Sequence, residues 1–363
     1  MLKRALLLFF LLLSALIVNA FLNPIPKKNV ALGFKPTYGV SFSFEQAGWY
    51  GLDSKKSYTE LLDGVKFKWV RLPFFWNQMI DSNGNFNQNF EDLKWAINEA
   101  EKRNIKVVVA LGAKTPYFPE YHWPEYVSKK VKFGDKINIS HPATADILTV
   151  DKKVVEELSQ FNNITYWQVE NEPYLANFDN LTIDESLLKE EVKVVRAADA
   201  KHRPIILNHV GPSVFDKRYK SLIEILQPGD VLGVNAYFKT QGTNLASFEI
   251  SNRQIIIKWP EWLIWPVQSW VGFSPDFAKV KNEAEKKGLK FWVLEMQVEP
   301  YIRVLDDARR RDFYFSATDV EKADTYLKAS RVESVGLWGA SFWLFRERVS
   351  DESWIETVAK IVN

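Results

Sequence analysis

The chain has 363 residues, 47% of them hydrophobic and 14% aromatic, which is enough to bury one large globular core. Its 47 Lys and Arg residues nearly balance its 45 Asp and Glu residues, and the formal net charge of +2 gives no long-range field that would attract nucleic acid or anionic lipid. Cysteine is absent, which excludes a disulfide framework, a thiolate metal site and a cysteine nucleophile.

The N-terminal segment has the pattern of a secretory signal peptide. Two basic residues precede an apolar run over residues 5 to 18, which is shorter than the roughly 20 residues of a transmembrane helix. Val18 and Ala20 satisfy the small-residue rule for cleavage after Ala20. We predict export with cleavage; the alternative is that residues 1 to 20 stay as a membrane anchor.

Both alternatives place the folded part of the chain outside the cytoplasm, so we expect a secreted or extracytoplasmic protein. Residues 1 to 26 are predicted to hold the signal peptide or anchor and a short linker, and residues 27 to 363 to form a single domain. We expect a monomer, and an N-terminal segment that is retained would associate it with a membrane.

From residue 35 onward, short β-branched or aromatic runs alternate with stretches of helical periodicity, a pattern typical of parallel strands joined by helices. Eight candidate strands cover residues 38 to 44, 67 to 74, 105 to 112, 164 to 170, 204 to 210, 231 to 238, 290 to 296 and 334 to 343. The clearest helices are predicted over residues 91 to 104, 185 to 202 and 318 to 331.

Eight such pairs in roughly 330 residues predict a (β/α)8 TIM barrel, with a doubly wound sheet as the alternative. Three long inserts cover residues 113 to 150, 239 to 273 and 298 to 317, and each follows a strand. Barrel enzymes build their sites from the loops on that side, so the sequence predicts a site at the carboxyl ends of the strands.

Two glutamates are expected at this end of the barrel. Glu172, in the stretch TYWQVENEPYLANF, follows the fourth strand, and Glu295 lies near the end of the seventh. Two facing carboxyl groups about 5 to 5.5 Å apart are what retaining glycoside hydrolysis needs, one as acid and one as nucleophile. The alternative is that both are buried ion-pair partners of Arg71 or of lysines, which perturb pKa values equally well.

The stretch TYWQVENEPYLANF resembles the Asn-Glu-Pro signature of a large clan of retaining barrel glycosidases that includes cellulases, mannanases, xylosidases and β-galactosidases. The resemblance covers most of residues 36 to 361. It implies that Glu172 is the acid/base, that Glu295 is the nucleophile and that Asn171 binds the sugar hydroxyl next to the reacting carbon.

The same resemblance implies roles for three further side chains. Arg71 on the second strand lies close to the nucleophile, Tyr237 after the sixth strand hydrogen-bonds it, and Trp343, ending the eighth strand, floors the subsite where the sugar is cleaved. A guanidinium and a phenol hydroxyl beside a carboxylate keep it charged and oriented, and an indole face matches the apolar face of a pyranose. A purely structural role is the alternative for each of the three, and for Trp343 the structural and the substrate-binding interpretations are equally supported.

Other polar residues are weaker candidates. Strand alternation places Glu170 on the same side as Glu172, and we expect it to be an interior polar residue satisfied inside the barrel. Glu299 is expected to shape a loop or to bind a substrate hydroxyl. His209, after the fifth strand, is a candidate substrate contact or a cap on the barrel. The histidine spacing lacks the pattern of a metal site, and no metal is expected.

The segment over residues 255 to 273 contains four tryptophans and only two charges. It is interpreted as a lid packed on the barrel, with an aromatic wall for extended sugar subsites and a patch in the membrane interface as alternatives. If the N-terminal segment is retained as an anchor, the patch would face lipid and the substrate would be a membrane-linked glycan.

The sequence thus predicts a retaining glycoside hydrolase that acts on an oligo- or polysaccharide by double displacement and needs no cofactor. Two alternatives stay open. One is a catalytically silent carbohydrate-binding or scaffold barrel, because a fold does not guarantee activity. The other is a transglycosylase, which differs only in how well water is excluded from the intermediate.

Overall fold

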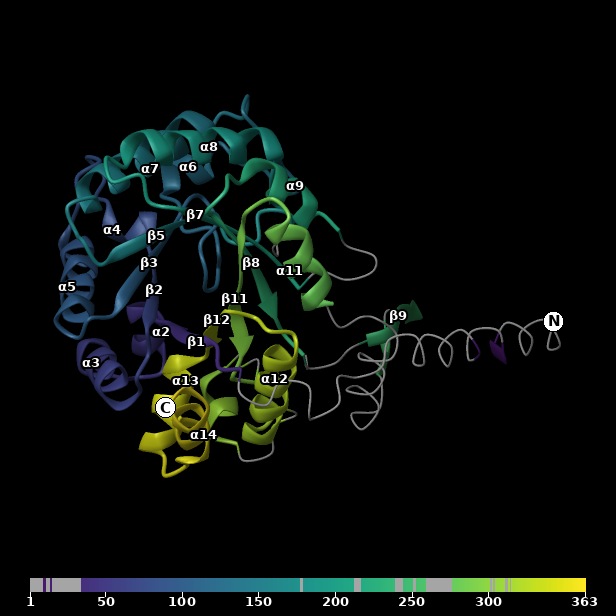
Figure 1. The fold of residues 1–363 in the computed structure, drawn as a ribbon. Coiled ribbons are helices and arrows are strands. Elements are labelled where there is room, and N and C mark those ends of the chain that lie inside the picture. The colour runs from purple at the N-terminus through teal and green to yellow at the C-terminus, as the bar shows by residue number, and fades with distance from the viewer. Residues whose placement is uncertain are drawn as a thin grey trace.

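A computed structural model gives the fold (Figure 1). The structure describes residues 9–10, 14, 34–176, 179–211, 217–238, 244–250, 253–258, 276–300, 302, 304–310, 313 and 315–363. Most of the predicted signal segment, and the tryptophan-rich segment from residue 259 onward, lie outside these residues, so the interpretations of both stay predictions. Within the described residues, no helix is long and apolar enough to cross a bilayer.

Eight parallel strands close into a barrel in the order β1, β12, β11, β8, β7, β5, β3, β2, which confirms the predicted (β/α)8 fold. The barrel strands are β1 (Thr37–Ser41), β2 (Trp69–Pro73), β3 (Lys106–Leu111), β5 (Ile164–Val169), β7 (Ile205–His209), β8 (Val231–Ala236), β11 (Lys290–Gln297) and β12 (Ser334–Trp338). The first and last strands pair with each other, so the yellow C-terminal elements of Figure 1 lie beside the purple β1.

Helices surround the barrel in Figure 1 and cover the outer faces of its strands. They are α2 (Phe44–Trp49), α3 (Ser54–Gly64), α4 (Trp76–Met79), α5 (Gln88–Lys102), α6 (Glu125–Ser128), α7 (Thr144–Leu158), α8 (Glu185–Ala198), α9 (Tyr219–Ile225), α11 (Phe277–Glu285), the 3-10 helix η1 (Leu305–Arg309), α12 (Ala317–Ala329), α13 (Ala340–Arg348) and α14 (Ser353–Val362). The three helices predicted most clearly correspond to α5, α8 and α12.

Two shorter sheets lie in the inserts. β4 (Lys136–Ile137) pairs in parallel with β6 (Thr182–Ile183), which joins the insert after β3 to the one after β5. β9 (Asn244–Ile250) and β10 (Arg253–Lys258) form an antiparallel pair in the insert after β8.

The eighth strand is shorter than predicted. It ends at Trp338 rather than at residue 343, because Gly339 adopts a φ of 122° and α13 begins at Ala340. A side chain at position 339 would be strained by this φ, and its Cβ would come within 2.8 Å of the Glu299 Cβ. Glycine therefore sets the point at which the chain leaves the strand.

The amino end of the barrel interior is filled by aromatic side chains. The rings of Trp69 and Trp292 stack with their centroids 5.4 Å apart, and the Trp69 indole donates a hydrogen bond of 2.8 Å to the Ser334 hydroxyl. Gly39 leaves the room that Trp69 occupies, since a Cβ at position 39 would lie 2.0 Å from this indole. This end is thus a packed core, and polar side chains are left to the opposite end.

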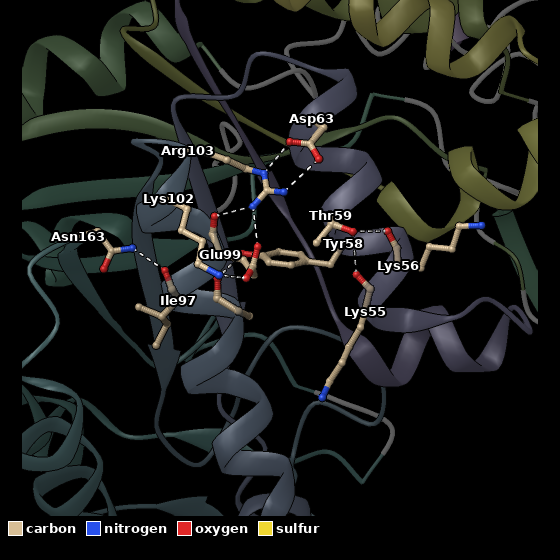
Figure 2. Close-up of polar contacts among 11 residues, drawn as sticks. Lys55, Lys56, Tyr58, Thr59, Asp63, Ile97, Glu99, Lys102, Arg103 and Asn163 are labelled. Carbon is tan, nitrogen blue, oxygen red and sulfur yellow. Dashed lines mark hydrogen bonds and ion pairs between the residues drawn. The ribbon is translucent and has the colours of Figure 1, made fainter.

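The helices around the barrel are also joined by polar contacts, as Figure 2 shows for α3 and α5. Arg103, which ends α5, binds both oxygens of Asp63 at 2.6 and 3.0 Å and donates to Glu99 at 2.7 Å. The buried Tyr58 hydroxyl of α3 donates to the carbonyl of Ala96 at 3.0 Å. These bonds fix the two helices that follow β1 and β2 relative to each other.

Candidate active site

Polar side chains form a layer at the carboxyl end of the barrel interior. Strand alternation turns Ser41, Arg71, Gln168, Asn208 and Asn235 inward, one from each of five strands, and all five are completely buried. The layer lies beyond the stacked tryptophans along the strands. Buried polar groups are costly unless they are hydrogen-bonded, and several side chains of this layer bond to one another and to the two glutamates.

Glu295 joins this layer because β11 contains a bulge. Trp292 and Leu294 already face the interior, so simple alternation would turn Glu295 outward. The pairing of β11 with β8 shifts register between Val293 and Glu295, and the pairing with β12 shifts at the same place. A bulge re-aims the side chain that follows it, and here it brings the Glu295 carboxylate to the barrel mouth.

Two donors hold the Glu295 carboxylate. Arg71 donates to Oε1 at 2.7 Å and the Tyr237 hydroxyl donates to Oε2 at 2.7 Å. Each oxygen thus has its own donor, which fixes the plane of the group and stabilises a negative charge on it. Glu295 is 4% exposed, and Tyr237 is 38% exposed at the mouth.

The turn that carries Glu172 has an unusual backbone. Glu170 and Glu172 have φ values of 59° and 47°, in the left-handed region that non-glycine residues seldom adopt. The amide of Glu172 donates to Asn208 Oδ1 at 2.9 Å, and its Oε1 accepts from Asn235 Nδ2 at 2.8 Å. Two asparagines of neighbouring strands therefore hold the main chain and the side chain of Glu172.

The surroundings of Glu172 favour its protonated form. Burial raises the pKa of Glu172 to about 8, and the negative charge of Glu295 acts in the same direction. Lys114 and the Asn235 amide oppose the rise but do not cancel it. At neutral pH one carboxyl group at the mouth therefore carries a proton while the other is held by a guanidinium.

Asn171 lies between the two glutamates in the network. Its Oδ1 accepts hydrogen bonds from Arg71 at 2.8 Å and from Asn208 at 3.0 Å. With both donors on the oxygen, the orientation of the amide is fixed and its NH2 group is turned away from them.

Glu170 does not face the barrel interior, contrary to the sequence expectation. Its two oxygens accept from the amides of Ala113 and Lys114, both at 2.7 Å. Gly112 makes this approach possible, because a Cβ at position 112 would lie 2.7 Å from Glu170 Oε1. Its predicted burial and hydrogen bonding are confirmed, but the predicted direction of its side chain was wrong, because strand alternation ends where the left-handed backbone begins.

Behind Glu170 lies a group of buried carboxyl groups that the sequence did not reveal. Asp151 of α7 and Glu191 of α8 are 1% and 0% exposed. Burial and the charge of Glu170 raise the pKa of Asp151 and that of Glu191 well above their ordinary values. No group of His, Cys, Asp or Glu side chains in the described part of the chain has an arrangement that could hold a metal ion.

The loop after β3 folds across the mouth. Lys114 and Tyr121 form an antiparallel bridge, and between them Tyr117 stacks on Trp338 at the end of β12, with ring centroids 4.3 Å apart. Glu299, after β11, lies close to Trp338, and burial raises the pKa of Glu299 to about 8. Together these residues form one wall of the site.

Two predicted site residues do not contribute to the barrel mouth. Trp343 lies within α13 and is completely buried, with its indole donating to the Val298 carbonyl at 2.9 Å. It offers no open ring face, because the strand that should have carried it ends at Trp338. His209 ends β7 as expected, but it is 2% exposed and lies on the outer side of the strand, in a T-shaped contact with Tyr219 of α9.

The structure brings Arg71, Asn171, Glu172, Tyr237 and Glu295 together as expected from the sequence. It adds four residues that the sequence reasoning missed, namely Asn208, Asn235, Lys114 and Trp338. The two asparagines had a signal, because each is a polar residue near the end of an otherwise apolar strand. The position of Lys114 depends on how the loop after β3 turns, and that of Trp338 on where β12 ends, and no local pattern reveals either.

The sequence matches the family model for cellulase (glycosyl hydrolase family 5) over residues 30–245, more than half of the chain. No curated protein sequence matches it.

Solved structures of low sequence identity share the fold. A GH5_18 enzyme from Streptomyces cattleya in complex with GlcNAc superposes with a TM-score of 0.57 at 12% identity, covering 84% of this chain and 70% of that one. PbGH5A, a glycoside hydrolase family 5 enzyme from Prevotella bryantii B14, gives a TM-score of 0.52 at 12% identity and covers 93% and 98%. The exo-beta-1,4-mannosidase Op5Man5 from Opitutaceae bacterium strain TAV5 gives 0.52 at 15% identity, covering 84% and 51%.

The match of the family model, together with a closed eight-stranded barrel that carries two glutamates at its mouth, identifies the enzyme class as glycosidase. The chain belongs to glycosyl hydrolase family 5.

Proposed function

We propose that the protein is a retaining glycosidase that cleaves the O-glycosidic bonds of an oligo- or polysaccharide by double displacement. One observation carries this proposal. Two buried glutamates meet at the mouth, and Glu172 has a pKa of about 8 while Arg71 and Tyr237 each donate a hydrogen bond to Glu295. A protonated carboxyl group facing a carboxylate is the pair that this reaction requires.

In the first step a Glu295 oxygen attacks the anomeric carbon, and the bond from that carbon to the leaving oxygen breaks. Glu172 gives its proton to the leaving oxygen, so the departing sugar is a neutral alcohol. In the second step Glu172, now ionised, takes a proton from water, and the resulting hydroxide displaces Glu295. The two inversions give net retention at the anomeric carbon.

Three groups would bind the sugar beside the glutamates. The Asn171 NH2 group, fixed by the donors on its oxygen, would donate to a hydroxyl next to the reacting carbon. The half-buried Trp338, rather than Trp343, would supply an aromatic surface together with Tyr117, which stacks on it. Glu299 would exchange a hydrogen bond with a second hydroxyl, because Oε2 has no partner among the described residues.

The stereochemistry of the first product tests the reaction. We would incubate the enzyme with 4-nitrophenyl β-glycosides of several sugars and follow the anomeric protons by NMR before mutarotation. The sugars include N-acetylglucosamine and mannose. Two similar structures contain bound GlcNAc or Manb1-4GlcNAc, and a third similar structure is that of an exo-beta-1,4-mannosidase. The proposal predicts that the β-anomer appears first; first appearance of the α-anomer contradicts it.

Variants separate catalysis from binding in the same assay. Glu172→Gln and Glu295→Gln should each lower turnover by at least about 1,000-fold, whereas Glu156→Gln, an exposed glutamate of α7, should leave it unchanged. If the protein binds these sugars but the wild type turns over none of them, a binding barrel replaces the proposed enzyme.

We also propose that the protein acts outside the cytoplasm. Two basic residues, the short apolar run and the Ala20 cleavage position support export. Intact-mass analysis of protein secreted by a bacterial host tests this. A mature chain that begins at Phe21 fits the proposal, whereas a full-length chain found only in the membrane fraction supports the anchor instead.

A further inference from the structure

Lys114 follows β3, and its side chain is completely buried beside the turn that carries Glu172. Lysine is seldom fully buried, because removing an ammonium group from water costs several kcal/mol unless nearby groups compensate its charge. We propose that Lys114 is a positioning residue for Glu172, one that fixes the turn that carries Glu172 and places a positive charge beside it. This inference rests on the proposed role of Glu172 as the acid/base.

Lys114 contacts the segment that carries Glu172 through its main chain and its side chain. Its Nζ donates to the carbonyls of Glu172 and Leu175 at 3.0 and 2.8 Å. Its carbonyl accepts from the amide of Asn171 at 2.7 Å, and its amide donates to Glu170 at 2.7 Å. One residue thus binds four positions of a six-residue stretch, so the stretch moves only if Lys114 moves.

The left-handed residues of this turn explain why such fixation is needed. A non-glycine residue in this region costs roughly 1 to 3 kcal/mol, and it persists only where its surroundings hold it. Glu170 and Glu172 both adopt that conformation. The main chain of Lys114 binds the carboxylate of Glu170 and the amide of Asn171, and its Nζ binds the carbonyl of Glu172. Lys114 thus stabilises the backbone that aims the Glu172 carboxyl group into the mouth.

The charge of Lys114 acts on the same carboxyl group. Burial and the negative charges of Glu295 and Glu120 raise the pKa of Glu172, whereas Lys114 and the Asn235 amide lower it. Glu120, in the loop after β3, lies 3.6 Å from Lys114 Nζ. A general acid works best when its pKa is near the operating pH, and without Lys114 the Glu172 proton would be held too tightly for efficient transfer.

A titration of Glu172 that needs no substrate tests the electrostatic part. We would label the glutamate carboxyl carbons with 13C and identify the Glu172 signal by its loss in Glu172→Gln. The pKa of this carboxyl group should rise by roughly one unit in Lys114→Met, which has a similar shape but no charge, and stay near the wild-type value in Lys114→Arg.

Glu120→Gln is the matched control variant, and it should shift the pKa of Glu172 in the opposite direction. It removes a negative charge and leaves Lys114 in place, so the pKa of Glu172 should fall. Its side chain is 25% exposed, so this variant should fold even where Lys114→Met does not, as thermal unfolding would show. A Glu172 pKa that is unchanged in every folded variant, or that moves in the reverse direction, overturns the proposal.

Kinetics then distinguish positioning from general structural support. On a glycoside that the wild type cleaves, the alkaline limb of kcat/KM should move up in Lys114→Met and down in Glu120→Gln. A merely structural Lys114 would lower kcat/KM at every pH without moving the limb, which contradicts the proposal. Shifted Glu172 pKa values in a protein without turnover on any glycoside would support the role of Lys114 while contradicting the proposed reaction.

Discussion

Single side chains account for the different surroundings of the two glutamates at the barrel mouth. Glu295 receives one donor on each oxygen, whereas Glu172 receives a neutral amide on Oε1 and lies in a buried position facing a negative charge. A charged donor stabilises a carboxylate far more than a neutral one. The proposed division of roles between acid/base and nucleophile therefore follows from Arg71, Tyr237 and Asn235.

Tyr237→Phe tests the second donor on Glu295. The change removes a hydroxyl that lies 2.7 Å from Oε2, and the loss of a hydrogen bond to a charged group costs about 1.5 to 3 kcal/mol. We expect kcat/KM to fall by about 10- to 100-fold with thermal stability nearly unchanged, because Tyr237 is exposed at the mouth. A change below about twofold would mean that the phenol does not support the reaction.

The two tryptophans near the end of β12 should respond differently to mutation. Trp338→Ala removes a half-buried ring at the mouth and should raise KM about tenfold while changing stability little. Trp343→Phe loses a buried hydrogen bond and leaves a void, so we expect about 1 to 3 kcal/mol of destabilisation with KM unchanged. Steady-state kinetics and thermal unfolding of both variants check this, and the reverse pattern would restore Trp343 as the sugar platform.

At the scale of the elements, α7, α8 and the end of β5 meet around Asp151, Glu191 and Glu170. Burial raises the pKa of each carboxyl group, so the folded protein binds more protons here than the unfolded chain does. Where the folded state binds more protons, stability falls as pH rises. The fall begins near the unfolded glutamate pKa of about 4.3 and continues upward until the folded groups lose their protons.

Glu191→Gln should flatten this dependence. Glutamine keeps the shape of the side chain but does not titrate. The free energy of unfolding should therefore fall less steeply with pH than in the wild type, with the two slopes differing by up to about 1.4 kcal/mol per pH unit. Chemical denaturation between pH 4.5 and 8 measures it, with Glu190→Gln, a more exposed neighbour on the same helix, as the control. Equal slopes in wild type and Glu191→Gln would contradict the idea that Glu191 stays protonated in the fold.

At the scale of the whole molecule, the barrel and the central part of the site were accessible from the sequence. Eight apolar runs alternating with helical stretches predicted the barrel, and the Asn-Glu-Pro resemblance identified Glu172 and its partner Glu295. Parallel strands place their carboxyl ends together. Glu172 and Glu295 are 295 − 172 = 123 positions apart in the sequence, but they were therefore expected to lie close together in the fold. The strands predicted from the periodic pattern thus position most of the site residues.

The remaining features depend on the points where periodicity stops. The bulge in β11, the left-handed Glu170 and the early end of β12 at Gly339 each redirect side chains by a local backbone change. Alternation rules extrapolate through such points and therefore misplaced Glu170 and Trp343. The approach of Lys114 to Glu172 is set by a loop that folds back across the mouth, and its conformation depends on packing against distant strands.

We propose Glu295 as the nucleophile of a retaining reaction, and trapping the covalent intermediate is the decisive experiment. We would incubate wild type and Glu295→Gln with 2-deoxy-2-fluoro glycosides that carry good leaving groups and measure intact masses. The wild type should gain the mass of one fluorosugar, located by peptide mapping on Glu295, and the variant should gain none. An adduct on another residue, or an adduct that persists in Glu295→Gln, would contradict it.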